Sequence, residues 1–437
     1  MPHRLSRRRF LQTTATAALG AVPILRAAEK KPAANERLHL GAIGTINQAR
    51  YNIDNLVAAG AEVVALCDVD ENRSGKTREK FPHASFDTVW RRLIDRKGLD
   101  AILVATPDHH HALATLAALR AGLHVYCEKP LTHTVAEARL VAETAAKQKR
   151  VTQMGTQIHA GHNYRRVVEL IQSGAIGTVR EAHTWCDKSY GGKDRPAGEE
   201  PVPAGFHWDL WLGPAPVRPF YHGKNKAANG VYHPFNWRDF WDFGGGTLND
   251  MACHHMDLPF WALKLRHPTR VAAEGPPVHA DTACPWTIVR YEFPARGELP
   301  PVNLTWYHGG KRPLALSNPG MPKWGDGNLF VGDKGMLLAG YGDHKLLPEK
   351  EYAGFKAPEP FIKNSIGHHK EFVEACKNGG TTTCNFDYSG ALTEAVLLGT
   401  VSYRCGRWLK WDAANLKTNV PEAERFIHKE YRKGWSV

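Results

Sequence analysis

The sequence has 437 residues, of which 43% are apolar and 23% charged, and its formal net charge is +12. A chain of this length exceeds what one hydrophobic core usually holds, so we expect two domains. Half of the net charge lies in residues 1–31, where seven Arg and Lys face one Glu, so the rest is only mildly basic and does not indicate a nucleic-acid partner.

The first 30 residues predict an export signal. An arginine pair stands before Phe10 and Leu11, and a weakly apolar run follows over residues 13–25. This pattern is similar to a twin-arginine signal peptide, with Gln12 where Lys is common; a disordered basic tail is the alternative. Because the run is shorter than the roughly 20 residues that cross a bilayer, and no later segment is long enough, we predict no membrane span and a periplasmic protein.

A strand–helix–strand unit follows the linker. Residues 38–44 are typical of a buried strand, residues 45–60 of a helix and residues 62–68 of a second strand ending in Asp68. The helix N-terminus of such a unit binds pyrophosphate, and the acid binds the adenosine ribose. The glycine fingerprint is incomplete, because Gly44 is followed by Ile46. Asp68 favours NAD over NADP, although Arg73 lies nearby.

The alternation of strands and helices continues to residue 155. Strands are expected at residues 101–105, 122–127 and 151–155, with a helix after each of the first two. This pattern predicts a doubly wound parallel sheet in a domain of residues 37–155. Glu128-Lys129-Pro130 ends the middle strand and places two charges where ligands bind in such sheets, unless it is an ordinary strand end with a surface ion pair.

The histidines and cysteines do not favour a metal site. Three consecutive histidines, 109–111, cannot converge on one ion, so we favour a helix cap and a nicotinamide-side contact from His111. The eight cysteines include no CxxC pair and are expected to pack as small apolar residues. A bridge between Cys376 and Cys384 is left open.

The second predicted domain, residues 156–437, begins with a helix over residues 162–173, a strand over residues 179–185 and an aromatic-rich segment over residues 206–243. If a helix starts at Thr247, Asp250 and His254 share one face, with Asp257 on the same side. An acid beside an imidazole raises its basicity, as a general base requires. A pair that only satisfies a buried helix surface is the alternative.

The rest of the chain predicts a largely antiparallel sheet. Strands without intervening helices are expected at residues 270–274, 287–293, 302–307, 328–331 and 335–338, with a hairpin turn at residues 332–335. Helices are expected at residues 367–376 and 388–406.

Glu128-Lys129-Pro130 after a nucleotide-binding half, and Asp250 with His254 before an antiparallel sheet, together resemble the Gfo/Idh/MocA oxidoreductase family. Trp208 to Gly213 is similar to a segment of its exported members. The resemblance implies an α/β Rossmann domain followed by an α+β domain, a nicotinamide cofactor, and a sugar, polyol or inositol-like substrate. It also implies a homo-oligomer through the C-terminal sheet.

The resemblance implies roles for the residues of this sequence that match the family's motifs. Lys129 contacts substrate and the nicotinamide ribose, Asp250 binds a substrate hydroxyl, and His254 is the acid/base. The resemblance implies cofactor contacts at Gly44, Ile46, Asn47, Asp68, Thr106, His111, Glu128, Lys129 and Gln157. It implies substrate contacts at Lys129, Trp237, Arg238, Asp250 and His254, with no metal.

Three functions are compatible with the sequence. The first is an NAD(P)-dependent oxidoreductase that transfers hydride to or from a secondary hydroxyl of a sugar, polyol or glycoside. The second is a glycosidase that recycles a tightly bound NAD through a 3-keto intermediate, since an exported protein has no evident pool of free nicotinamide. The third is a non-catalytic binding protein on the same fold, for which Ile46 is the best argument.

Overall fold

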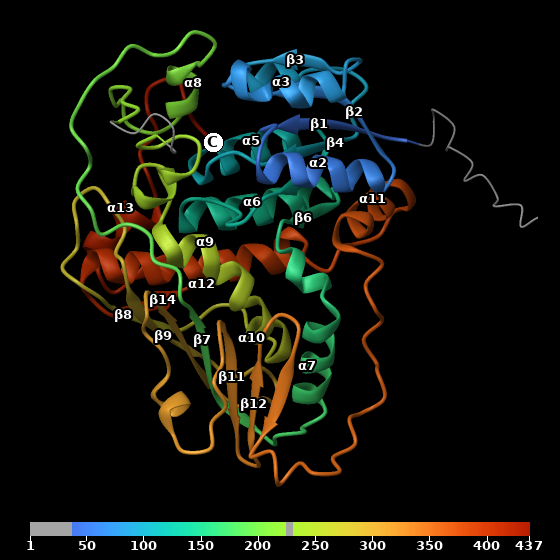
Figure 1. The fold of residues 1–437 in the computed structure, drawn as a ribbon, viewed down its shortest axis with the longest axis vertical. Coiled ribbons are helices and arrows are strands. Elements are labelled where there is room, and N and C mark those ends of the chain that lie inside the picture. The colour runs from blue at the N-terminus through green and yellow to red at the C-terminus, as the bar shows by residue number, and fades with distance from the viewer. Residues whose placement is uncertain (1–36, 224–229) are drawn as a thin grey trace, which may run out of the picture. The chain divides into compact units, whose positions relative to one another are not determined.

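The first sheet carries the nucleotide-binding half. The computed structural model describes residues 37–223 and 230–437, so the predicted signal lies outside the described residues. Six strands follow the order β3-β2-β1-β4-β5-β6, and all neighbours are parallel (Figure 1). This is the strand order of a Rossmann sheet, which confirms the predicted fold class. The elements are β1 (Leu38–Ile43), α2 (Gln48–Ala58), β2 (Ala61–Cys67), α3 (Glu71–Lys80), β3 (Ser85–Asp87), α4 (Trp90–Ile94), β4 (Ala101–Val104), α5 (Asp108–Arg120), β5 (His124–Cys127), α6 (Val135–Gln148) and β6 (Thr152–Met154).

The second sheet has nine strands in the order β13-β12-β11-β7-β10-β9-β8-β14-β15. Every neighbouring pair is antiparallel except β7 with β10, which confirms the predicted largely antiparallel sheet. Its strands are β7 (Val179–Cys186), β8 (Arg270–Glu274), β9 (Thr287–Phe293), β10 (Val302–His308), β11 (Gly327–Gly332), β12 (Met336–Ala339), β13 (His344–Leu347), β14 (Leu409–Asp412) and β15 (Lys417–Thr418).

Helices join the two sheets. Figure 1 shows α12 running between α6 and the strands β8 and β9, and α12 contacts α6, α9 and β8. The remaining elements are η2 (Gln157–Ala160), α7 (His162–Gln172), α8 (Trp208–Leu212), η3 (Asn236–Asp239), α9 (Gly246–His255), α10 (Asp257–Ala262), η4 (Leu314–Ser317), α11 (His368–Asn378), α12 (Phe386–Cys405), η5 (Pro421–Ala423) and α13 (Glu424–Ile427). Among the described helices, none is long and apolar enough to cross a membrane.

Two expectations are corrected by the structure, and one alternative that was left open is decided. Helix α2 begins at Gln48 rather than residue 45, because the backbone turns at Gly44 (φ +91°) and Asn47 (φ +52°) first. Helix α9 ends at His255, so Asp257 begins α10 and its carboxylate meets the His159 ring at 2.9 Å instead of sharing the Asp250 face. All eight cysteines are free thiols, including the two for which a bridge was left open. The boundary near residue 155 stays a prediction.

Candidate active site

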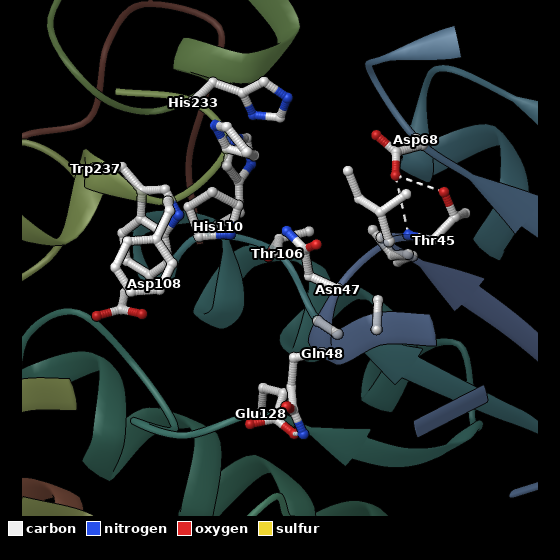
Figure 2. Close-up of a pocket in the computed structure, with 18 of the residues that line it drawn as sticks. Thr45, Asn47, Gln48, Asp68, Thr106, Asp108, His110, Glu128, His233 and Trp237 are labelled. Atoms are coloured by element: carbon white, nitrogen blue, oxygen red, sulfur yellow. Dashed lines mark hydrogen bonds between the residues drawn. The ribbon is translucent and has the colours of Figure 1, made fainter. Parts of the chain in front are cut away.

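A cavity of about 940 Å³ lies at the carboxyl ends of β1, β2, β4 and β5. Side chains from the second half of the chain, including Trp237, Arg238, Asp250 and His254, form its opposite wall. Figure 2 shows Asp108 and Trp237 on one side of this cavity and Asp68 and Thr45 on the other. Ligands of open α/β sheets bind at this edge, where the strand order reverses.

The turn between β1 and α2 fits a pyrophosphate despite Ile46. A Cβ added at Gly44 would lie 2.4 Å from the Ala105 carbonyl oxygen, so only glycine is accommodated there. The first turn of α2 has no side-chain cap, and Asn47 and Gln48 are exposed where they line the cavity. The Ala49 N–H donates to the Ile46 carbonyl at 3.1 Å, but no hydrogen bond from the Asn47 or Gln48 N–H is present within the described residues, so these two groups are open to an anion. Ile46 lines the cavity and leaves the helix start open.

Asp68 is held rigidly at the end of β2. Its Oδ2 accepts hydrogen bonds from the Thr45 N–H at 2.9 Å and hydroxyl at 2.7 Å, and Oδ1 accepts from the Asp70 N–H at 3.0 Å. Burial raises the pKa of Asp68, and the bonds from Thr45 oppose that rise. The carboxylate therefore lines the cavity in one orientation, with lone pairs left for a ribose hydroxyl.

Glu128 connects three side chains beside the cavity through hydrogen bonds. Its Oε1 accepts hydrogen bonds from Asn52 at 2.7 Å, Gln157 at 3.0 Å and Gln48 at 3.3 Å. Burial raises the pKa of Glu128, while the neighbouring Lys129 charge lowers it. A Cβ at residue 155 would lie 2.5 Å from this oxygen, which explains why Gly155 follows β6.

Lys129 joins the two halves of the site. Its ammonium donates to Asp250 Oδ1 at 2.6 Å and to the Asp250 carbonyl at 2.8 Å, and the Arg238 Nε donates to the same Oδ1 at 3.1 Å. Burial alone would raise the pKa of Asp250, but the two cations outweigh it and hold that pKa well below its usual range. Asp250 is thus an ionised acceptor, and Lys129 is a desolvated cation whose Nζ is fixed beside it.

His254 lies one helical turn after Asp250 and lines the same cavity. Among the described residues, none makes a hydrogen bond to its ring; Tyr164 binds only its backbone carbonyl. Burial lowers the pKa of His254 well below the ordinary value, and the Lys129 charge lowers it further. The imidazole is therefore neutral. The expectation that Asp250 pairs with it and raises its basicity is wrong, because the Asp250 carboxylate is bonded to Lys129 and Arg238 instead.

The other residues implied by the resemblance divide into two groups. Thr106, Gln157 and Trp237 line the cavity, and Trp237 supports the Arg238 guanidinium 4.2 Å from its ring centroid. His111 does not line it, because its two ring nitrogens lie 2.8 Å from the Pro130 and Thr106 carbonyl oxygens inside the protein. The neighbouring His110 reaches the cavity wall instead.

Asp108 is a cavity residue that the sequence analysis missed. It begins α5, is only 4% exposed, and is without a side-chain hydrogen bond within the described part of the chain. Burial raises its pKa to about 8, against the opposing charges of Arg238 and Lys129. Nothing in the sequence separates this acid from an ordinary helix start, since only the fold buries it.

Replacing Asp108 by asparagine should stabilise the ligand-free protein more at about pH 9 than at about pH 5. The folded-state pKa is near 8 and the ordinary value is 3.8, so ionisation destabilises the native fold increasingly from about pH 4 to about pH 8. Asparagine cannot ionise, so the variant does not suffer this loss of stability. Urea unfolding at the two pH values measures it, with the exposed Glu298→Gln as control; an equal effect at both pH values would contradict the prediction.

Comparison with known proteins agrees with this geometry. The model described as "Oxidoreductase family, NAD-binding Rossmann fold" matches residues 38–156, and "Oxidoreductase family, C-terminal alpha/beta domain" matches residues 163–298. Inositol 2-dehydrogenase 3 of Saccharopolyspora erythraea is 34% identical over 149 residues, which make 33% of this chain and 44% of that protein. A glycosyl hydrolase family 109 protein of Shewanella pealeana is 24% identical over 203 residues, covering 40% of this chain and 44% of that protein.

The chain therefore spans less than half the length of these two curated relatives. Among solved structures, the WlbA dehydrogenase of Chromobacterium violaceum in complex with NADH and UDP-GlcNAcA matches with a TM-score of 0.60. It is 15% identical, and the match covers 87% of this chain and 98% of that one, so it shows the fold alone. The two matched halves, the Rossmann strand order and the open helix start at the cavity agree: the chain belongs to the Gfo/Idh/MocA oxidoreductase family, with its NAD-binding Rossmann fold.

Proposed function

We propose that this protein is an NAD-dependent oxidoreductase acting on a secondary hydroxyl of a sugar or polyol. The observation that carries the proposal is the meeting of Lys129, Asp250 and His254 on one cavity whose other end is the Gly44 turn. The name of the inositol 2-dehydrogenase relative supports the substrate class. Bound NAD would supply the two-electron acceptor for the carbinol hydrogen.

Three residues bind the substrate, stabilise its charge and transfer its proton. The ionised Asp250 accepts a hydrogen bond from a substrate hydroxyl, and the Lys129 ammonium stabilises the negative charge that develops on the reacting oxygen. His254, neutral and open to the cavity, takes the hydroxyl proton at a ring nitrogen. In the direction of reduction the same three groups act in reverse, with His254 returning the proton.

The cofactor contacts proposed for this chain follow the cavity. Gly44, Ile46, Asn47 and Gln48 lie where the pyrophosphate would bind, and Asp68 lies at the ribose end. The Asp68 carboxylate supports NAD over NADP, because it would repel a ribose phosphate. Glu128, Thr106 and Gln157 line the middle of the site. These assignments are tested by the dinucleotide binding described below.

A second candidate is a glycosidase that uses NAD without net redox change. The family 109 relative favours it by name. Oxidation at C3 acidifies the C2–H, and a base removes that proton while the C1–O bond breaks and a C1=C2 double bond forms. The aglycone leaves with the glycosidic electron pair and is protonated. Water then adds at C1 as a proton returns to C2, and the hydride returns to the ketone at C3. The sum is hydrolysis, so no external oxidant is consumed. We further propose twin-arginine export for residues 1–30 and a homo-oligomer through the nine-stranded sheet.

One experiment separates these functions. The purified protein is assayed for bound NAD after denaturation, then incubated with sugars, inositols and simple glycosides in deuterated water. NADH formed from added NAD and a free sugar or polyol supports the oxidoreductase. Sugar released from a glycoside without added NAD, with deuterium at the carbon beside C3, supports the glycosidase. A protein that binds no NAD and turns over none of these compounds would overturn both.

A further inference from the structure

The residues after α13 close one end of the cavity. Trp435 lines it together with Arg91 of α4, which follows β3, the strand beside β2. Because Cys67 of β2 pairs with Asp87 of β3 in parallel, Asp68 and the chain that leads into α4 leave the sheet at neighbouring strand ends. A segment far from the Rossmann half in sequence therefore supplies part of the cavity wall at the ribose end.

Arg91 contacts two indole rings. Its guanidinium carbon is 4.5 Å from the Trp90 centroid and 4.3 Å from the Trp435 centroid. Within the described residues, no acid forms an ion pair with Arg91, and burial lowers its pKa. Trp435 also meets the His110 ring edge-on, with centroids 5.6 Å apart. The Trp90 and Trp435 rings are tilted by 48° to each other, so the wall combines indole rings at different angles with a planar cation.

Polar contacts fix the segment that carries Trp435. The Arg432 side chain donates to the carbonyls of Gly213 at 2.8 Å and Asp209 at 2.9 Å. The Lys429 ammonium and the Tyr431 hydroxyl each lie 2.8 Å from Glu137 Oε1. Since Glu137 is buried and belongs to α6, the segment is tied to the Rossmann half as well as to α8. Trp435 is thus held in place before any ligand arrives.

We propose that Trp435 and Arg91 form the wall against which the adenine ring of the dinucleotide packs, so that residues 428–437 help to retain the cofactor. The inference rests on the proposed NAD binding. Trp435 lies outside both segments that the family models match, and Arg91 lies within the first of them. A nucleobase presents a π-face that stacks on aromatic rings and on guanidinium planes. Asp68 takes the ribose at the same end, which sets the base beside this wall.

Titration of the nucleotide-free full chain with NAD and with ADP-ribose tests the proposal. Trp435→Ala should raise the Kd of both ligands at least about tenfold, equivalent to about 1.4 kcal/mol, because ADP-ribose shares the adenosine end. Trp435→Leu, which keeps apolar bulk without a π-face, should show most of this loss, and Trp435→Phe should recover affinity.

Trp408→Ala is the matched control. Trp408 is 47% exposed, and its ring centroid lies 4.4 Å from the Arg270 guanidinium carbon. Replacing it by alanine therefore removes a similar cation–π contact away from the cavity. Unchanged Kd values in folded Trp435→Ala and Trp435→Leu would overturn the adenine wall while leaving the proposed function intact. Absence of NAD binding by the unmodified protein would overturn the proposed function, and the wall with it.

Discussion

Replacing His254 with asparagine is expected to lower kcat by about 10²–10⁴-fold, the usual contribution of a positioned general acid or base. The imidazole lines the cavity one turn after Asp250, and no hydrogen bond to its ring is recorded in the described chain. Asparagine is similar in size but cannot accept the substrate proton. The KM for the sugar should change little, because Asp250 and Lys129 still bind the hydroxyls.

Steady-state kinetics with the sugar identified by the substrate screen measures this effect. Since the substitution breaks no hydrogen bond to the His254 ring within the described residues, the thermal midpoint should stay close to that of the unmodified protein. His83→Asn, at an exposed position away from the cavity, is the control and should retain full activity. A folded His254→Asn protein with kcat within about threefold of the original would remove His254 from the mechanism.

Replacing Lys129 with methionine should lower kcat/KM by about 10²–10³-fold, the loss typical of one electrostatic stabiliser of a developing oxyanion. Methionine keeps the length and apolar stem of the side chain while removing the charge. The change also takes away the 2.6 Å ion pair to Asp250, whose side chain is 10% exposed. Because Arg238 still holds Asp250 at 3.1 Å, we expect a stability loss below the roughly 3–5 kcal/mol of a fully orphaned buried charge.

A double variant separates the two effects of Lys129→Met. Adding Asp250→Asn removes the carboxylate that Lys129→Met leaves paired with Arg238 alone, so urea unfolding should show recovered stability while activity stays low. Lys80→Met, which breaks an exposed ion pair to Asp54, controls for loss of a positive charge. Recovery of activity in the double variant would mean that Lys129 acts only by neutralising Asp250, and the proposed oxyanion role would be wrong.

The sequence predicted those parts of the site whose arrangement depends only on residues close together in the chain. Glu128-Lys129-Pro130 follows a buried strand, and in a parallel sheet a strand end lies at the ligand edge whatever the rest of the fold does. Asp250 and His254 are four residues apart in one helix, so their common face follows from helical geometry. The same reasoning was wrong for Asp257, because α9 ends at His255, and Asp257 begins α10 with its carboxylate bonded to His159.

The features of the site that the sequence did not predict depend on contacts between distant segments. His111 looked like a cavity residue, but its ring turns inward to the Thr106 and Pro130 carbonyls. Asp108 looked like a helix start, and only burial against the second half of the chain shifts its pKa to about 8. The missing second glycine at Ile46 suggested a damaged turn, yet the backbone turns at Gly44 and Asn47 and leaves the start of α2 open.

By itself the sequence determined the two sheet types and the strand end and helix that carry the candidate site residues, because hydrophobic period and residue spacing act over a few residues. Tertiary structure alone decided which of these meet: the 2.6 Å contact of Lys129 with Asp250 joins residues 121 positions apart. It alone brought Trp435 to Arg91 at the ribose end of the cavity. Such pairings depend on how the helices and sheets pack against each other, and no local pattern encodes that packing.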